Sequence, residues 1–371
     1  MRTIMTAARP FIGWLTVALF LVFGSGWMAG LANHALALGL FVWLFLVIIW
    51  VAFGVVHEAE TLAEMLGEPL GTLVLTLSIV IIEVVLISAV MLGPEGNATL
   101  ARDTMYSVLM IVLNGVVGLG LLMGGIRHYE QAYNLKGASA YLSVIIPLTI
   151  IALVLPDFTT STSDGSLSPA QALMFSVLTI GLYGIFLWLQ TGRHRGYFVA
   201  QDAQPIDAKE MEHQRPSAID KKGLFVHFIL LLVNILPIVI LSKSLASILD
   251  YGIAATGAPA ALGGIVIATL VFAPEGISAL IAIRADRLTR AINLCLGAVT
   301  STLGLTVPAV LAISLYTGRH VLLGLPPSGI VLLVSTLILS SITFSNSRTT
   351  MLEGAVHLSL FVVFLVLVFS P

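Results

Sequence analysis

The sequence has few charged residues, one cysteine and none of the common nucleotide-binding motifs. Only 10% of its 371 residues are Asp, Glu, Lys or Arg, whereas a water-soluble domain carries about a quarter. Cys295 has no second cysteine to pair with, so an intrachain disulfide is excluded, and no Cys/His cluster suggests zinc. No GxxxxGK[ST] motif is present, which argues against ATP as an energy source. The formal net charge of −2 argues against nucleic acid as a partner.

Apolar residues make up 58% of the chain and gather in long runs. A bilayer core about 30 Å thick needs about 20 apolar residues as a helix. The predicted fold class is therefore an all-α polytopic membrane protein. Eleven transmembrane helices are expected, at 10–31, 36–56, 69–92, 104–126, 139–155, 168–190, 223–242, 257–283, 292–316, 327–344 and 351–370. The first resembles a signal peptide, but no convincing cleavage site follows it, so we expect a retained helix.

Basic residues are distributed unevenly between the two sides that these spans define. With the N-terminus in the cytoplasm, 14 of the 17 Lys and Arg residues lie on the cytoplasmic side, and Arg102, Lys243 and Arg319 lie outside. Cytoplasmic loops carry the basic excess in membrane proteins. We therefore expect a bacterial-type inner membrane, with the N-terminus in the cytoplasm and the C-terminus outside. The lipid bilayer is the expected partner, and the sequence leaves the oligomeric state open.

The longest polar stretch divides the chain into two halves with a similar pattern. Gly71 lies twelve residues before Glu83, and Gly263 lies twelve residues before Glu275. Each half holds five spans, and an odd number makes the second half enter the membrane with opposite polarity, as in inverted-repeat transporters. The predicted organisation is an extra N-terminal helix in 1–35, a first repeat in 36–191, a charged cytoplasmic linker in 192–222 and a second repeat in 223–371. The linker is either a solvated connection or an ion-sensing regulatory loop.

Two acidic residues, Glu83 and Glu275, lie in the middle of apolar runs. An acidic side chain at the centre of a membrane helix costs about 2.5 to 3.5 kcal/mol on insertion scales. Two of them in matching places favour an ion or proton site over the alternative, a neutral acid that only joins helices. Without a cation, such carboxyl groups take up protons. Alternation between a bound cation and a proton is the chemistry of exchange.

Small polar side chains accompany both glutamates. Thr76 shares a helical face with Glu83 and Ser78 flanks it, while Thr269 and Ser278 lie near Glu275. Each hydroxyl alone favours a hydrogen bond to its own helix, but together with the carboxylates these groups predict an oxygen-rich cavity. Such a cavity suits Ca²⁺, Na⁺ or K⁺ as a transported ion, with no cofactor.

Proline and two further polar residues add to this prediction. Pro274 removes one backbone donor and leaves a carbonyl about one turn earlier unpaired. Asn114 and Ser301 are further candidate ligands in later spans. For Asn114, interhelical hydrogen bonding and a place on the ion path are equally good interpretations.

Three segments, 57–92, 272–315 and 347–361, resemble the calcium/cation antiporter superfamily and most closely its ChaA-type cation/proton antiporter branch. The resemblance implies ten core helices in two inverted repeats plus an extra N-terminal helix. It also implies that Glu83 and Glu275 are alternately protonated and cation-bound. The wider family places Gly-Asn shortly before each glutamate and amide residues in the following helices. This chain instead has Ile79-Val80, Phe272-Ala273, Met110-Ile111 and Ser301-Thr302. The missing amide oxygens weaken the case for calcium and make sodium or potassium credible substrates.

Other charged and titratable residues have simpler interpretations. Glu58, Glu60, Glu64 and Glu68 form either a short solvated connection or a funnel that concentrates cations at the cytoplasmic mouth. His227 and His357 lie toward the ends of their spans, where histidines with satisfied hydrogen bonds at the membrane interface are favoured over the alternative, a proton relay.

These observations predict a secondary active antiporter that exports cytoplasmic cations in exchange for protons. A passive cation channel and a proton-independent sodium/calcium exchanger are the alternatives. An enzyme is not expected, because the chain has no HExxH, no GxSxG and no pair of intramembrane aspartates.

Overall fold

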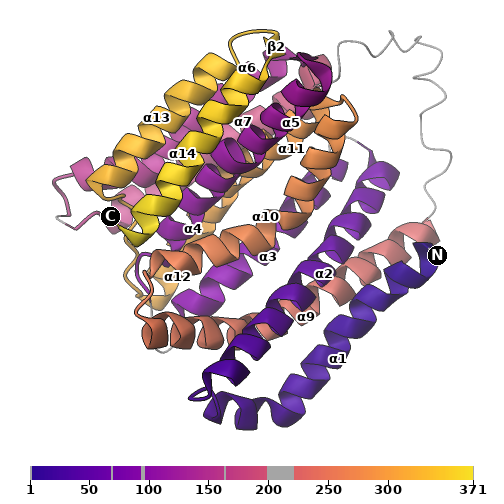
Figure 1. Cartoon of the computed structure of the whole chain (residues 1–371), viewed down its shortest axis with the longest axis vertical. Helices are drawn as coiled ribbons and strands as arrows, with labels where there is room; N and C mark the ends of the chain where they lie inside the picture. Colours follow the sequence, from indigo (N-terminus) through magenta and orange to yellow (C-terminus); the bar gives the residue numbers. More distant parts are fainter. Residues whose placement is uncertain (1, 68–69, 93–96, 163, 199–220, 371) are drawn as a thin grey trace. The chain divides into compact units, whose positions relative to one another are not determined.

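The computed structural model describes residues 2–67, 70–92, 97–162, 164–198 and 221–370, and nearly all of its regular structure is helical (Figure 1). Before the linker the elements are α1 (Arg2–Ala29), α2 (His34–Leu66), α3 (Leu70–Met91), α4 (Leu100–Leu109), η1 (Met110–Val116), α5 (Val117–His128), β1 (Gln131–Ala132), α6 (Leu135–Thr149), η2 (Ile150–Val154), η3 (Leu155–Phe158), α7 (Pro169–Thr191) and η4 (Arg195–Phe198). After it come α9 (Lys221–Thr256), α10 (Ala261–Arg284), α11 (Leu288–Ser301), η5 (Thr302–Thr306), α12 (Val307–Thr317), α13 (Pro327–Thr343), β2 (Arg348–Thr349) and α14 (Met351–Phe369). Helices satisfy backbone polar groups internally, which a bilayer requires.

The predicted fold class is confirmed. Among the described residues, ten helical stretches are long and apolar enough to cross a membrane and α13 is a shorter apolar helix, and each predicted span coincides with one of these eleven. Two predicted lengths are wrong. Helix α2 has 33 residues and α9 has 36, so each is about 50 Å long at the usual rise per residue. Both exceed the bilayer core and must tilt or extend beyond it.

The chain forms two compact units. Unit 1 contains residues 1–100 and 216–274, and unit 2 contains residues 101–215 and 275–371. One boundary between them lies inside α10, between Pro274 and Glu275. This division differs from the sequence repeats in 36–191 and 223–371, which stay a prediction.

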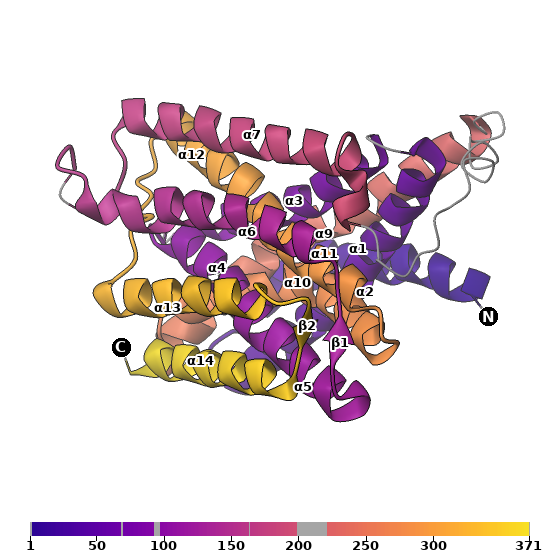
Figure 2. The ribbon, with the colours of Figure 1, turned by 90° about the horizontal axis from the view of Figure 1, so that it is seen from above.

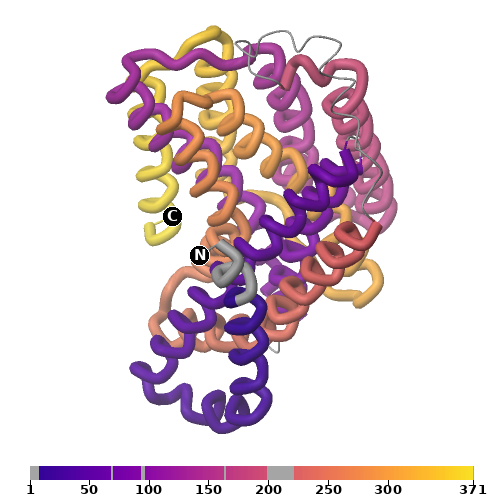
Figure 3. Tube along the Cα trace, turned by 90° about the vertical axis from the view of Figure 1, so that its right-hand side faces the viewer, coloured from indigo at the N-terminus to yellow at the C-terminus, as the bar shows by residue number. Residues whose placement is uncertain are grey.

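In unit 1, α2 packs against α3 and α9, and α1 packs against α2 and α9. Figure 3 shows α1 and α2 as antiparallel indigo and violet tubes joined by a tight connection. Asn33 begins α2, because its Oδ1 accepts hydrogen bonds from the N–H groups of Ala35 and Leu36. Apolar side chains such as Leu44 and Val55 are fully buried between these helices.

In unit 2, α5 packs against α14, α6 against α11, and α7 against α12. Gly118 and Gly354 allow the backbones of α5 and α14 to come into contact, because a Cβ at either position would meet the opposite backbone. Figure 2 shows α13 and α14 side by side, with β1 and β2 near their ends. The two strands are antiparallel and pair Gln131 with Thr349 and Ala132 with Arg348.

Tyr133 ties the connection after β1 to the end of α13. Its hydroxyl donates hydrogen bonds to the backbone carbonyls of Thr343 and Asn346. Burial raises the pKa of Tyr133, and the charge of Glu353 raises it further. The hydroxyl therefore stays protonated and remains a donor.

Three segments of unit 2 are π-helical: η1, η2 and η5. A π-helical segment has i→i+5 hydrogen bonds and is frequently found at functional sites. Segment η1 lies in the fourth predicted span and η5 in the ninth, which are equivalent positions in the predicted repeats. Their first residues, Met110 and Thr302, belong to the dipeptides that depart from the family pattern.

Candidate functional site

Glu83 lies on α3 and is 1% exposed. It is the only charged residue of this helix, whose other residues are apolar apart from small hydroxyl side chains. Ser78 is also buried, and its Oγ donates a hydrogen bond to the carbonyl of Val74 at 2.7 Å. Thr76 is half-buried on the same helix. Sequence and structure therefore agree that α3 carries one carboxyl group inside unit 1.

Glu275 lies on α10, which continues as a helix through Pro274. Glu275 and Ser278 are half-buried, and within unit 2 Glu275 acts electrostatically on the buried Cys295 thiol of α11. Pro274 has no N–H to give to the carbonyl of Leu270 one turn earlier. This part of α10 therefore offers a backbone carbonyl close in sequence to a carboxyl group.

The candidate hydroxyl ligands mostly bond to their own helices, as predicted. Ser78 does so on α3, Thr269 Oγ1 donates to the carbonyl of Ile265 at 2.8 Å, and Ser301 Oγ donates to that of Ala298 at 2.9 Å. A hydroxyl whose proton is used in this way keeps lone pairs that can only accept. Such oxygens suit a cation.

Asn114, on η1, is completely buried and makes interhelical hydrogen bonds. Its Nδ2 donates to Thr336 Oγ1 on α13 at 2.8 Å, and its Oδ1 lies 3.0 Å from His357 Nδ1 on α14. His357 Nε2 in turn lies 3.0 Å from Thr343 Oγ1. With Thr343 as donor to Nε2, the histidine is neutral and donates through Nδ1. We call these four residues the Asn114 network.

The Asn114 network corrects one prediction. His357 has satisfied hydrogen bonds as expected, but it is 0% exposed and lies in the interior of unit 2 instead of at an interface. Its place near the start of the last apolar run gave no sign of this burial. The polar residues Thr336 and Thr343, spaced seven apart on one face of α13, were the available signal.

The π-helical segments leave backbone carbonyls outside the helical hydrogen-bond ladder. At the end of η1 the Val117 N–H bonds to the carbonyl of Val112, so the carbonyl of Leu113 is passed over, and His357 bonds to it. At the end of η5 the Val307 N–H bonds to the carbonyl of Thr302, and Pro308 has no N–H for Leu303. Sequence analysis missed both features, although Pro308 marked the second.

The predicted site residues are divided between the two units. Glu83, Thr76, Ser78 and Thr269 belong to unit 1, and Glu275, Ser278, Asn114 and Ser301 belong to unit 2. Within the described ranges, no group of three or more His, Cys, Asp and Glu residues could hold a metal ion. Within each unit, the candidate site thus consists of one carboxyl group with hydroxyl and carbonyl oxygens near it in sequence.

The acidic cluster at the end of α2 differs from the prediction. Glu58 is 5% exposed and lies 2.7 Å from His227 Nδ1, so it is not a solvated residue. Glu60 is half-buried and Glu64 is exposed. Glu68 and most of the linker, residues 199–220, lie outside the described residues.

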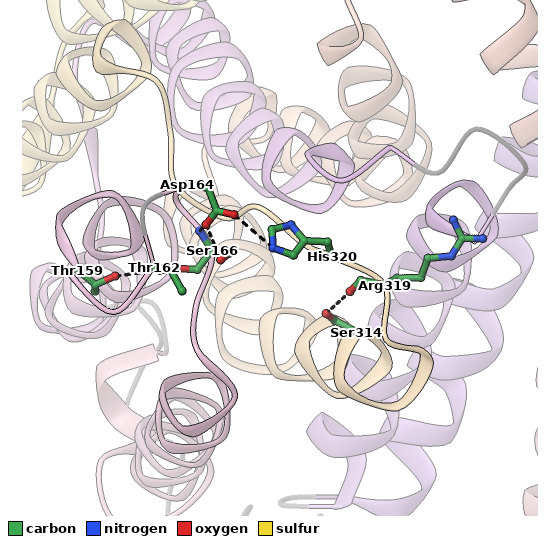
Figure 4. Close-up of polar contacts among 7 residues, drawn as sticks. All are labelled: Thr159, Thr162, Asp164, Ser166, Ser314, Arg319 and His320. Carbon is green, nitrogen blue, oxygen red and sulfur yellow. Dashed lines mark hydrogen bonds and ion pairs between the residues drawn. The ribbon is translucent and has the colours of Figure 1, made fainter.

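A second polar cluster lies in the loops before α7 and α13 (Figure 4). Asp164 accepts hydrogen bonds from Ser166 Oγ at 2.6 Å and Ser166 N–H at 3.1 Å, and it lies 3.3 Å from His320 Nε2. The Ser166 bonds, and then the nearby His320, lower the pKa of Asp164. The N–H groups of Leu323 and Gly324 donate to the carbonyl of Gly165, which joins the two loops.

The chain belongs to the sodium/calcium exchanger protein family, which matches residues 36–192 and 226–370. Helix α1 lies outside the matched residues. The chain is 40% identical over 319 residues to the sodium-potassium/proton antiporter ChaA of Escherichia coli, covering 86% of each chain. It is 24% identical over 288 residues to a Ca²⁺/H⁺ antiporter of Synechocystis, covering 75% of this chain and 77% of that one.

A solved structure confirms the fold. The structure of native YfkE aligns over 100% of both chains with a TM-score of 0.73 at 19% identity. The predicted resemblance is therefore confirmed, and the chain is a multi-pass membrane protein of an antiporter family.

Proposed function

We propose that the chain is a secondary active antiporter that exports cytoplasmic Na⁺, K⁺ or Ca²⁺ in exchange for protons. The observation that carries this proposal is Glu83, a carboxyl group 1% exposed on an otherwise uncharged membrane helix. A carboxyl group in such surroundings is stable with a cation beside it or a proton on it. Glu275 supplies a second carboxyl group at the corresponding place of the predicted repeat.

The proposed cycle alternates two states of these glutamates. On one side of the membrane the deprotonated carboxylates bind the cation, and on the other side they release it and take up protons. Both states are neutral when the protons released equal the charge of the cation bound, two for Ca²⁺ and one for Na⁺ or K⁺, so an apolar gate can close over either, whereas bare charge would resist closure. Because the gate does not close over an empty, charged site, the protein changes sides only with a cation or protons bound, and the two fluxes are coupled.

The neighbouring oxygens support a cation as the cargo. Ser78, Thr269 and Ser301 use their protons within their own helices, so toward any further partner these oxygens can only accept. Thr76, Ser278 and Asn114 complete the proposed ligand set. No resident cofactor is required for this cycle.

Within the substrate class we favour Na⁺ and K⁺ over Ca²⁺. Calcium takes six to eight oxygen ligands, yet Ile79-Val80 and Phe272-Ala273 supply no side-chain oxygen. The amide oxygen of Asn114 already accepts one hydrogen bond from His357, which leaves it a single lone pair for a cation. The higher identity to a sodium-potassium/proton antiporter, 40% against 24% for the Ca²⁺/H⁺ antiporter, points in the same direction.

We place the protein in a bacterial inner membrane with its N-terminus in the cytoplasm and its C-terminus outside. The relatives are bacterial transporters, not enzymes. The distribution of 14 of 17 basic residues on one side supports this orientation.

The test is proton flux in proteoliposomes with a trapped pH-sensitive dye. Adding Na⁺, K⁺ or Ca²⁺ to the wild-type protein should release protons. Glu83→Gln and Glu275→Gln should each lower the rate of proton release more than about 100-fold. This exceeds the loss that is typical when a residue outside the ligand shell of an ion is changed. Glu130→Gln, at an exposed position just after α5, is the matched control and should keep the wild-type rate.

Three outcomes would contradict the proposal. Wild-type rates in either glutamine variant would remove the glutamates from the mechanism. A cation current without obligatory proton movement would indicate a channel. Sodium/calcium exchange that is insensitive to pH would indicate proton-independent exchange.

A further inference from the structure

Three helices of unit 1 meet at a polar cluster that the proposed cycle does not use. Glu58 on α2 is buried, and its Oε2 lies 2.7 Å from Nδ1 of His227 on α9. The side chain of Glu58 is 7% exposed, whereas that of His227 is 32% exposed. A buried carboxyl group is thus bonded to a histidine that is partly exposed at the surface of the protein.

Helix α1 adds a permanent positive charge to this pair. Arg9 Nη1 donates a hydrogen bond to the carbonyl of Phe53 at 3.2 Å, and the guanidinium lies 5.8 Å from the centre of the Trp50 ring. Its charge acts directly on Glu58. A nearby cation favours the ionised carboxylate, and histidine is the side chain type that ordinarily gains a charge near neutral pH.

The same helices also touch through their backbones. Pro237 removes the N–H that would bond to the carbonyl of Val233, and Trp14 Nε1 donates to that carbonyl at 3.1 Å instead. A Cβ on Gly13 would meet Pro237. These contacts bind α1 to α9 at its proline.

Gly54 provides a similar close approach between α2 and α9. A Cβ at this position would meet Oδ1 of Asn234 on α9 and the side chain of Arg9. Because the three helices are in such close contact here, a bond between Glu58 and His227 affects how α2 is held against α9.

We propose that Glu58 and His227 form a regulatory proton-binding site that holds α2 against α9 at acid pH and loosens this contact at alkaline pH. This inference rests on the proposed antiport function. Protonation of His227 converts its hydrogen bond to the Glu58 carboxylate into an ion pair, in which both partners are charged and the bond is stronger. An alternating-access cycle requires helices to move, so the stronger bond slows exchange. Cation export therefore accelerates as the pH rises through the range in which histidine loses its proton.

Other titratable or charged groups occur on the helices that pack around the pair. Among the described residues of α1, α2, α3 and the first half of α9 they are Arg9, His34, His57, Glu60, Glu64, Glu83, Lys221 and Lys222. Arg9 keeps its charge throughout the pH range of the test. His57 is exposed and precedes Glu58 directly, which makes it the natural control.

The experiment measures cation-driven proton flux of the full chain in proteoliposomes from about pH 6 to pH 8, a window in which histidine changes charge. Wild type should speed up about fivefold over this range, the factor expected when a partly exposed ion pair loses the charge on one partner. His227→Gln can still donate to Glu58 but cannot become charged, so its rate should stay high at acid pH. His227→Arg should be slow at every pH, and His57→Gln should follow wild type. A wild-type pH profile in His227→Gln would overturn the proposal.

A second measurement does not depend on transport. The thermal midpoint of the detergent-solubilised protein is measured against pH for wild type, His227→Gln and Glu58→Gln. Wild type should gain stability over both variants as the pH falls from about 8 to about 6, because the charged pair forms in that range. A difference that is the same at every pH would overturn the proposal. If wild type moves no protons with any cation, the proposed function fails, and this series still decides whether the pair binds a proton.

Discussion

The two units use polar side chains in different ways. In unit 2 the Asn114 network joins η1, α13 and α14 through side chains that bond to one another, deep in the interior. In unit 1 the bonds from Arg9 and Trp14 go to backbone carbonyls, and the pair of Glu58 and His227 is partly open to solvent. A fully satisfied buried network specifies one arrangement of its helices. Apolar helix contacts in a membrane are much less directional.

This difference assigns the units different mechanical roles. Unit 2 contains the π-helical segments, and His357 bonds to the carbonyl that η1 leaves outside its ladder. Unit 1 consists of long helices whose buried contacts are mainly apolar side chains. We therefore expect unit 2 to be damaged more than unit 1 by the loss of one buried polar side chain.

The largest expected effect tests this expectation with two buried asparagines. Asn114→Ala should lower the free energy of unfolding by about 3 kcal/mol, because His357 and Thr336 are left with unmet hydrogen bonds in the interior. Asn234→Ala in unit 1 should cost about 1 kcal/mol or less, because Asn234 Nδ2 donates only to the carbonyl of Leu230 on its own helix. Both are measured by unfolding in detergent. Equal losses would show that the units do not differ in this respect.

The fold was predictable from the sequence because the bilayer restricts the solutions so strongly. Apolar runs near 20 residues located all eleven helices, including α13. Helix lengths were less predictable. The predicted span ended before the charged residue Lys243, but α9 continues through Lys243 and Asp250 to Thr256. Lysine side chains reach the interface from such positions, so a charged residue need not end a helix.

The candidate site was predictable only in part. Glu83 and Glu275 are conspicuous because a charge in an apolar run is expensive. The π-helical segments and the burial of His357 were not predictable, because they depend on which helices pack against η1. Glu58 was grouped with Glu60 and Glu64 as part of a solvated connection or a cation funnel, and only the position of α9 shows that it faces His227.

The second prediction concerns the contact of α5 with α14, which fixes the position of His357. Gly354→Val should lower the free energy of unfolding by about 2 kcal/mol, because the added carbons meet the backbones of Gly118 and Leu122. Gly184→Ala on α7 is the control, since a Cβ there meets nothing within 4 Å. It should leave stability unchanged or raise it by up to about 1 kcal/mol, the usual helix preference for alanine. A tolerated Gly354→Val would show that α5 and α14 can separate without cost.

The smallest effect is expected in the loops of unit 2, where Asp164 is exposed and bonded locally. Hydrogen bonds from Ser166 lower the pKa of Asp164, so its contribution to stability is present above the ordinary aspartate range and is lost as the pH falls through the lowered value. Asp164→Asn should therefore differ slightly from wild type near neutral pH and match it in strong acid. The check is the thermal midpoint of both proteins against pH in detergent. A difference between the two thermal midpoints that grows toward acid pH would contradict the stabilising role given to the ionised Asp164 carboxylate. It would mean that the loop, like the Asn114 network, depends on a buried group. If the two midpoints behave as expected, the strong polar contacts of unit 2 lie in its interior, where water cannot replace a lost hydrogen-bond partner.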